Sequence, residues 1–127
     1  MNPLPFLNIG TDIVHLPRIT RLLHRTSVAR FTRRILTDPE QHDFHSRFAP
    51  PTPITPDLSR WLAGRFAAKE AARKAAPSGA ASLGWKDVMV QVSAGGRPEI
   101  LYLGGGRVGK LSISHDGEYV IAMVVAA

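Results

Sequence analysis

The spacing of apolar and polar residues predicts one strand followed by helices in the first half of the chain. Residues 6–16 are rich in Ile, Val and Leu and predict a strand that is interrupted at Gly10. Pro17 stands where a helix would begin. Apolar residues at helical spacing then predict a helix over 18–35, broken near residues 26–27.

Two further helices are predicted around a proline-rich segment. Thr37 and Glu40 have the spacing of a capping box, so a short helix should cover 38–47. Residues 48–56 hold four prolines and predict a stiff surface loop, because neither flank is large enough to fold alone. The main helix is predicted over 56–76.

The last third of the chain changes to the alternating pattern of strands. The predicted strands cover residues 86–92, 99–103, 111–115 and 119–126. Glycine-containing connections separate them: a turn at 95–98, a flexible connection at 104–109 and a hairpin turn at 116–117. A strand, then helices, then strands indicates an α+β fold, with a long helix packed on a mostly antiparallel sheet in a single domain over 1–127.

Composition excludes several classes of protein. A chain of 127 residues with 44% hydrophobic residues fits one soluble globular domain. No apolar run approaches the roughly 20 residues of a membrane helix, and no charged segment precedes the first apolar stretch, so neither a membrane span nor a signal peptide is expected. The absence of cysteine excludes disulfides and thiolate metal sites.

The charge favours an anionic partner. Sixteen Lys and Arg against ten Asp and Glu give a net charge of +6, which suits nucleic acid, an anionic membrane, a phosphorylated small molecule or an acidic protein. The segment 17–35 contains arginines and no acid: Arg18, Arg21, Arg25, Arg30, Arg33 and Arg34. The first three would form one cationic stripe on a helix, which favours a docking surface over a merely solvated face.

The helical segment 65–75 carries the densest pattern of charge. One row at i, i+4, i+8 spacing contains Phe66, Glu70 and Lys74, and a second row contains Arg65, Lys69 and Arg73. Such helices are usually solvated faces with ordinary ion pairs. Alanines between the rows, however, make this helix thin enough to approach a polyanion closely.

Two other segments contain candidate chemistry. Asp12 lies in an apolar strand, where a carboxylate is costly unless it is paired or bound to a metal. Near the end of the chain, Ser112 and Ser114 should share one face of a strand and His115 the other, so Ser114 and His115 do not form a nucleophilic dyad.

These three segments together resemble a known family. Residues 10–14 (GTDIV), 65–75 (RFAAKEAARKA) and 112–115 (SISH) stand in the order and separation of the phosphopantetheinyl transferase superfamily, holo-acyl-carrier-protein synthase type. The resemblance implies transfer of 4′-phosphopantetheine from coenzyme A (CoA) to a serine of an acidic acyl carrier protein, with release of 3′,5′-ADP. It also implies a role in fatty acid biosynthesis and the fold of that superfamily.

The resemblance assigns roles to residues. The Mg²⁺ ligands would be Asp12 and Glu70. The residues that contact CoA would be Arg65, Lys74, Gly96, Arg97, Pro98, Ser114 and His115, and the carrier would dock on Arg18, Arg21 and Arg25. Glu70, Lys69 or a metal-bound water would take the proton of the serine hydroxyl.

The residue chemistry agrees with these roles. Phosphoryl transfer depends on charge neutralisation and positioning, and Mg²⁺ binds through one or two carboxylates, water and substrate phosphates. Two departures from the family are visible: His15 replaces a frequent Glu, and only a short segment, 104–110, stands where the family tends to have a helix. The resemblance further implies a homotrimer with sites between subunits, in mitochondria or cytoplasm and with no membrane partner.

Other interpretations remain open at this point. A basic nucleic-acid-binding module would explain the charge, but the strands offer few aromatic residues for stacking on bases. A metal-dependent phosphohydrolase would use the same two carboxylates on water, and an inactive relative would use neither. The interpretation as a transferase that does not bind nucleic acid accounts for most of these features.

Overall fold

A bent antiparallel sheet and several short helices surround one long helix. The structure is a computed structural model and describes residues 8–50 and 52–126. The strands of its sheet are β1 (Asn8–His15), β2 (Val88–Val92), β3 (Pro98–Tyr102), β4 (Arg107–Asp116) and β5 (Tyr119–Ala126). They lie in the order β1-β5-β4-β3-β2 with every neighbouring pair antiparallel. The predicted α+β class is confirmed.

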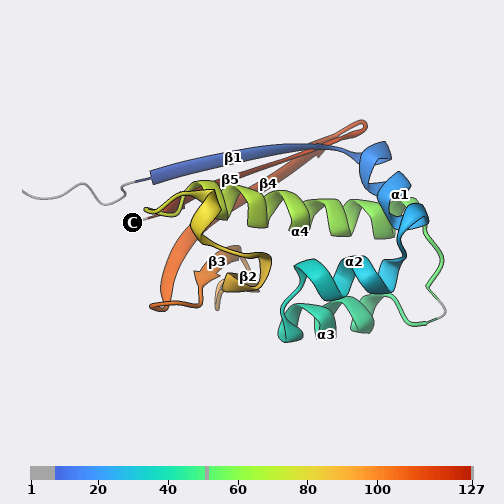
Figure 1. The fold of residues 1–127 in the computed structure, drawn as a ribbon, viewed down its shortest axis with the longest axis horizontal. Helices are drawn as coiled ribbons and strands as arrows, with labels where there is room; N and C mark the ends of the chain where they lie inside the picture. Colours follow the sequence, from blue (N-terminus) through green and yellow to red (C-terminus); the bar gives the residue numbers. More distant parts are fainter. Residues whose placement is uncertain (1–7, 51, 127) are drawn as a thin grey trace, which may run out of the picture.

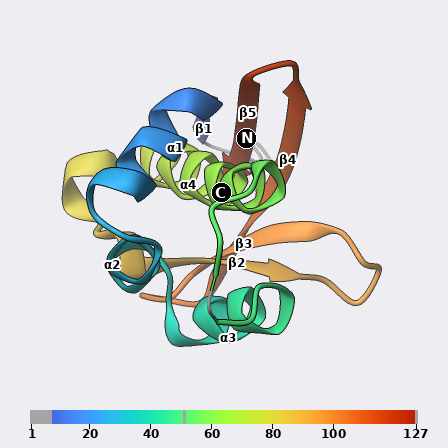
Figure 2. The same ribbon diagram turned by 90° about the vertical axis from the view of Figure 1, so that its right-hand side faces the viewer.

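The helices precede most of the sheet in the chain. They are α1 (Leu16–Arg25), α2 (Val28–Ile35), α3 (Asp38–Arg47) and α4 (Pro56–Lys74). In Figure 1, β1, β5 and β4 run along one side of α4, while α2 and α3 lie on the opposite side. A view nearly along α4 shows it at the centre of the other elements (Figure 2). None of the helices in the described part of the chain is both long and apolar enough to cross a membrane.

Small side chains make α4 the centre of the core. Its alanines at 63, 67, 68, 71 and 72 are fully buried, so other elements approach the helix from several directions. The closest approach is made by β1. A Cβ atom added to Gly10 would lie 2.1 Å from the carbonyl oxygen of Ala71, so only glycine permits this crossing.

The helix boundaries agree with the capping signals in the sequence. The break near residues 26–27 is confirmed, and the Ser27 side chain accepts a hydrogen bond from the Arg30 N–H at 3.0 Å to begin α2. The capping box of α3 is confirmed as well. There the Thr37 N–H donates to Oε1 of Glu40 at 2.8 Å.

Three details of the sequence prediction were wrong. Gly10 does not interrupt β1, because it is paired with Val124 in the ladder. Residues 85–87 form a 3₁₀ turn before β2 rather than part of the strand. The strand β4 begins at Arg107, within the segment expected to be a flexible connection. The first two residues of the strand predicted over 6–16 lie outside the described residues.

The crossing of β1 and α4 gives a first prediction. Gly10→Ala should lower the free energy of unfolding by about 3 kcal/mol, because a backbone carbonyl must move to admit the methyl group. Denaturant unfolding measures this loss. Gly104→Ala is the matched control, because a Cβ there meets nothing within 4 Å. Equal stability of both variants would contradict the close approach.

Candidate active site

The crossing of β1 and α4 brings Asp12 next to Lys74. Asp12 faces α4, since it lies between the buried positions Gly10 and Val14 on alternate residues of the strand. Its side chain is only 15% exposed, and its Oδ1 accepts a hydrogen bond from Lys74 Nζ at 3.2 Å. Lys74 Nζ also donates to the carbonyl oxygen of Thr11 at 3.0 Å. The ammonium therefore lies beside the buried carboxylate.

The second oxygen of Asp12 is not satisfied. Oδ2 is buried and has no hydrogen-bond partner among the described residues. Burial raises the pKa of Asp12; the neighbouring Lys74 lowers it and the negative charge of Glu70 raises it further. A buried carboxylate oxygen without a donor, close to a second carboxylate, is suited to a bound cation.

Glu70 is held by Arg73. Arg73 Nη1 donates to Oε1 of Glu70 at 2.5 Å, three residues along α4. Arg73 is fixed in turn, because Nε donates to the carbonyl oxygen of Leu83 at 2.7 Å and Nη2 to that of Ala80 at 3.1 Å. The sequence analysis placed Arg73 in a row of charges but missed this role. The i, i+3 spacing from Glu70 was the available signal.

This donor set fits a magnesium ion. The described residues contain no group of three or more His, Cys, Asp or Glu side chains that could hold a metal. Asp12 and Glu70 supply two carboxylates. Mg²⁺ commonly binds one or two carboxylates, and water and substrate phosphates complete its octahedron.

Lys69 lies away from this cluster. Its side chain is fully buried, and Nζ donates to Oε1 of Glu40 at 2.5 Å and to the carbonyl oxygen of Ile35 at 2.6 Å. Burial lowers the pKa of Lys69 and the Glu40 carboxylate raises it. The expected catalytic role of Lys69 does not fit this placement, because the ammonium has no access to a substrate.

Within one copy of the chain, the other residues predicted to contact CoA also lie away from Asp12, Glu70 and Lys74. Arg65 lies over the ring of Trp61 at 4.3 Å, and burial lowers its pKa. His115 is exposed, and its register position on β4 is opposite Val120, so β5 separates it from β1. The remaining residues are Ser114, on the other face of β4, and Gly96, Arg97 and Pro98, at the exposed turn between β2 and β3 (Figure 2).

The departure at His15 does not alter the two carboxylates. His15 Nε2 lies 2.8 Å from Oε2 of Glu118, and its ring is 4.9 Å from that of Tyr119. Strand alternation places His15 on the face opposite to Asp12. It therefore fastens the β4–β5 turn to the end of β1.

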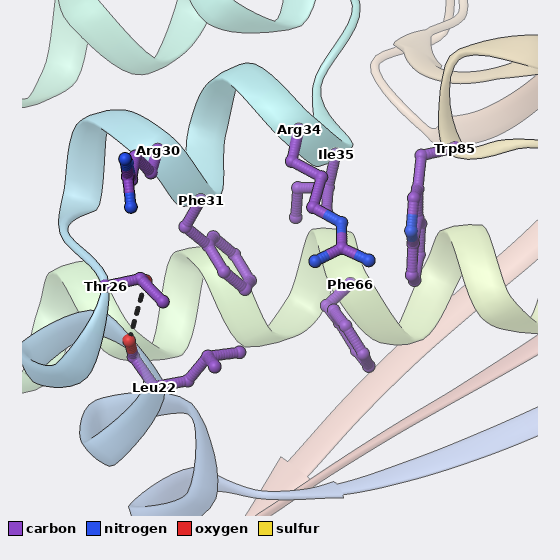
Figure 3. A pocket seen from close by; sticks show the side chains of 8 residues that line it. All are labelled: Leu22, Thr26, Arg30, Phe31, Arg34, Ile35, Phe66 and Trp85. Atoms are coloured by element: carbon purple, nitrogen blue, oxygen red, sulfur yellow. Dashed lines mark hydrogen bonds between the residues drawn. The ribbon is translucent and has the colours of Figure 1, made fainter.

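An apolar pocket of about 430 Å³ has two arginines of α2, Arg30 and Arg34, among its lining residues (Figure 3). Arg18, Arg21 and Arg25 are exposed on α1, and the Arg18 guanidinium is 5.7 Å from the centre of the Phe66 ring. The pocket is lined by Leu22, Phe31, Ile35, Phe66 and Trp85, with Thr26, Arg30 and Arg34 at its edge. In Figure 3, Arg34 extends its guanidinium toward Phe66 and Trp85. The pocket is therefore lined mainly by apolar side chains, together with two arginines of α2.

The fold is a small α+β domain in which the crossing of β1 and α4 brings the Asp12 carboxylate near Glu70. The sequence matches the 4′-phosphopantetheinyl transferase superfamily over residues 8–124. The chain belongs to this superfamily, which confirms the family resemblance and the predicted enzyme class.

Individual relatives agree over almost their whole lengths. The mitochondrial 4′-phosphopantetheinyl transferase B of Aspergillus fumigatus is 63% identical, with 98% of this chain and 97% of the relative aligned. Among solved structures, a Bacillus anthracis holo-(acyl-carrier-protein) synthase in complex with CoA (3′,5′-ADP) has a TM-score of 0.74 at 33% identity, over 95% of this chain and 96% of the other. The Neisseria meningitidis holo-[acyl-carrier-protein] synthase has a TM-score of 0.76 at 34% identity, covering 96% and 98%.

The buried state of Asp12 predicts opposite effects on stability and metal binding. Its raised pKa means that the protonated form suits the fold better, so this stabilisation is present at low pH and lost as the pH rises through the raised value. At neutral pH Asp12→Asn should therefore melt at the same temperature as the wild type or higher. The same variant should lose the Mg²⁺-dependent rise in melting temperature.

Differential scanning fluorimetry with and without Mg²⁺ measures both effects. Asp43→Asn, at an exposed position of α3, should keep the Mg²⁺ response. In the wild type the response should disappear on acidification at a pH above the ordinary aspartate pKa of 3.8. A full Mg²⁺ response in Asp12→Asn would refute the assignment of this carboxylate.

Proposed function

We propose that the protein transfers 4′-phosphopantetheine from CoA to a serine hydroxyl of an acyl carrier protein and releases 3′,5′-ADP, with Mg²⁺ held by Asp12 and Glu70. The observation that carries the proposal is Oδ2 of Asp12, which has no partner within residues 8–50 and 52–126 and lies beside Glu70 and Lys74, in a chain of this superfamily. The similarity to a synthase solved in complex with CoA (3′,5′-ADP) supports the choice of substrate.

The side chains around the site divide the work of phosphoryl transfer. Bound Mg²⁺ would supply positive charge to the diphosphate and to the leaving 3′,5′-ADP. Lys74 is 47% exposed, so its ammonium can turn from Asp12 to a substrate phosphate. Arg73 keeps the Glu70 carboxylate in place. Burial removes Lys69 from the three proton acceptors considered, which leaves Glu70 and water.

The proposed enzyme is a homotrimer in which a neighbouring copy completes each CoA site. The outer face of β1 and β5 is apolar and exposed, with Ile9 and Ile13 at 62%, Tyr119 at 51%, Ile121 at 46% and Met123 at 42%. Such a face suits burial against another chain. In the proposed trimer, Arg65, His115 and the 96–98 turn of one copy would lie near Asp12 of another copy, although they lie away from Asp12 within one chain.

The carrier protein is proposed to dock on α1 and α2. Arg18, Arg21 and Arg25 would pair with acidic residues of the carrier, and the adjacent pocket of Figure 3 would take one of its apolar side chains. A mitochondrial location is proposed because the Aspergillus relative is named as mitochondrial. A role in fatty acid biosynthesis is proposed from the family resemblance alone.

Intact-protein mass spectrometry tests the activity. An apo carrier incubated with the protein, CoA and Mg²⁺ should gain one phosphopantetheine group, and EDTA should prevent the gain. Asp12→Ala and Glu70→Ala should each lower the rate by at least about a thousandfold, because the diphosphate loses its metal. Asp43→Ala should retain activity.

Each rival interpretation has its own signature in these assays. Release of phosphate or pantetheine from CoA without a carrier would indicate a phosphohydrolase instead of a transferase. Salt-sensitive retention of an oligonucleotide, without CoA binding, would indicate a nucleic-acid-binding module.

The assembly can be tested separately. Ile13→Glu and Ile121→Glu should convert a trimer into monomers in light scattering and lower the transfer rate, because a charge cannot be buried without a partner. Leu103→Glu, at another exposed apolar position outside this face, should stay trimeric. A wild-type monomer with full activity would contradict the shared site.

A further inference from the structure

Lys69 and Glu40 form a buried ion pair in which both carboxylate oxygens of Glu40 accept hydrogen bonds. Their side chains are 0% and 2% exposed. Oε1 of Glu40 accepts hydrogen bonds from Lys69 Nζ and from the Thr37 N–H, and Oε2 accepts one from the Val90 N–H at 2.9 Å. Lys69 Nζ also donates a hydrogen bond to the carbonyl oxygen of Ile35.

Through these bonds the pair joins four separate elements. Ile35 is the last residue of α2, Glu40 lies in the first turn of α3, Lys69 is on α4 and Val90 is in β2. The ammonium also satisfies a carbonyl at the C-terminal end of α2, where no residue of that helix can donate. Apolar side chains of similar volume fill such positions with no loss of stability in other proteins, so a buried pair is better explained by the geometry that it specifies.

The geometry that the pair specifies lies between the two functional regions. Lys69 directly precedes Glu70 and follows Phe66 by three residues, and Phe66 lines the apolar pocket. On the other side of that pocket are Arg34 and Ile35, in the last turn of α2 (Figure 3). The bond from Lys69 to Ile35 therefore joins the two helices, α2 and α4, that contribute opposite walls of the pocket.

We propose that Lys69 is a positioning residue, which uses Glu40 and the Ile35 carbonyl to hold the last turn of α2 against α4 and so shapes the carrier-docking pocket. This inference rests on the proposed function for the identity of the partner. It replaces proton transfer by Lys69 with a role in recognition of the carrier.

The hydrogen bonds that hold Asp12 and Glu70 at the proposed metal site do not include Lys69 or Glu40. Asp12 is bonded to Lys74, and Glu70 to Arg73, which is fixed by backbone carbonyls in the segment after α4. Loosening α2 should therefore weaken recognition of the carrier and leave the binding of CoA and Mg²⁺ intact. This split distinguishes positioning from a general role in catalysis.

The test is steady-state kinetics of the double variant Lys69→Met with Glu40→Gln. Methionine keeps the length of the buried stem, and glutamine keeps an acceptor for the Thr37 or Val90 N–H without a buried charge. KM for the carrier should rise by about tenfold or more, while KM for CoA and kcat at saturating carrier stay within about twofold of the wild type. Lys69→Met alone leaves Glu40 charged and unpaired, so it is the less stable variant.

Matched controls separate the possible outcomes. Val124→Ala truncates a fully buried side chain on β5, outside the pair and the pocket, and should lower the melting temperature without raising KM for the carrier. If this control raised KM for the carrier as much as the double variant does, the Lys69–Glu40 pair would have a purely structural role. A fall in kcat with both KM values unchanged would return Lys69 to proton transfer. Either result overturns the inference.

A measurement that does not depend on enzymatic activity distinguishes a failure of this inference from a failure of the proposed function. The indole N–H resonance of Trp85, in the pocket, should shift in the double variant and not in Val124→Ala. If the wild type transfers phosphopantetheine but the double variant has an unchanged KM and an unshifted Trp85 resonance, only the positioning role fails. If the wild type transfers nothing to any apo carrier, the proposed function fails, and the carrier-recognition role fails with it.

Discussion

The close contact between β1 and α4 is the constraint on which the site depends. Gly10 lets the strand backbone lie against the helix backbone, and the buried alanines of α4 leave room for it. Two residues further along the strand, Asp12 then faces the turn of α4 that contains Glu70 and Lys74. A side chain at position 10 would separate the two carboxylates that are proposed to hold Mg²⁺.

One buried and one partly buried acid show how a carboxylate can serve stability or chemistry. Glu40 has hydrogen bonds on both oxygens and an ammonium partner, so its charge is fully compensated within the protein. Asp12 keeps Oδ2 without a partner among the described residues, and its ionisation is unfavourable to the fold. An unsatisfied buried group persists where function needs it, and a bound cation would relieve this one.

Most elements could be predicted from the sequence because their signals are local. The capping box at Thr37 and the break at Ser27 determine helix ends through hydrogen bonds within a few residues. The start of β4 was missed because its glycines suggest flexibility, whereas Gly109 is buried beside Val124 and Tyr102 and continues the sheet. That contact is made by residues distant in the chain, so no local pattern reveals it.

The arrangement of the site could be predicted only in part, because it too depends on contacts between segments that are distant in the chain. The helix α4 has alanines on several sides, so periodicity cannot show which row of charges faces solvent. Asp12, Glu70 and Lys74 were assigned through the family resemblance, and the structure places them together. Lys69, in the neighbouring row, turned out to be buried because Glu40 and the end of α2 lie on that side of the helix. The partner in an ion pair between distant elements cannot be read from the spacing within one of them.

Anomalous diffraction from crystals grown with Mn²⁺ in place of Mg²⁺, together with CoA, tests the central claim directly. The account predicts one strong peak within coordination distance of Oδ2 of Asp12 and of the Glu70 carboxylate, against the CoA diphosphate, with the Lys74 ammonium turned to a phosphate. A peak bound by other residues, or a CoA complex in which Lys74 still covers an empty Asp12, would contradict it.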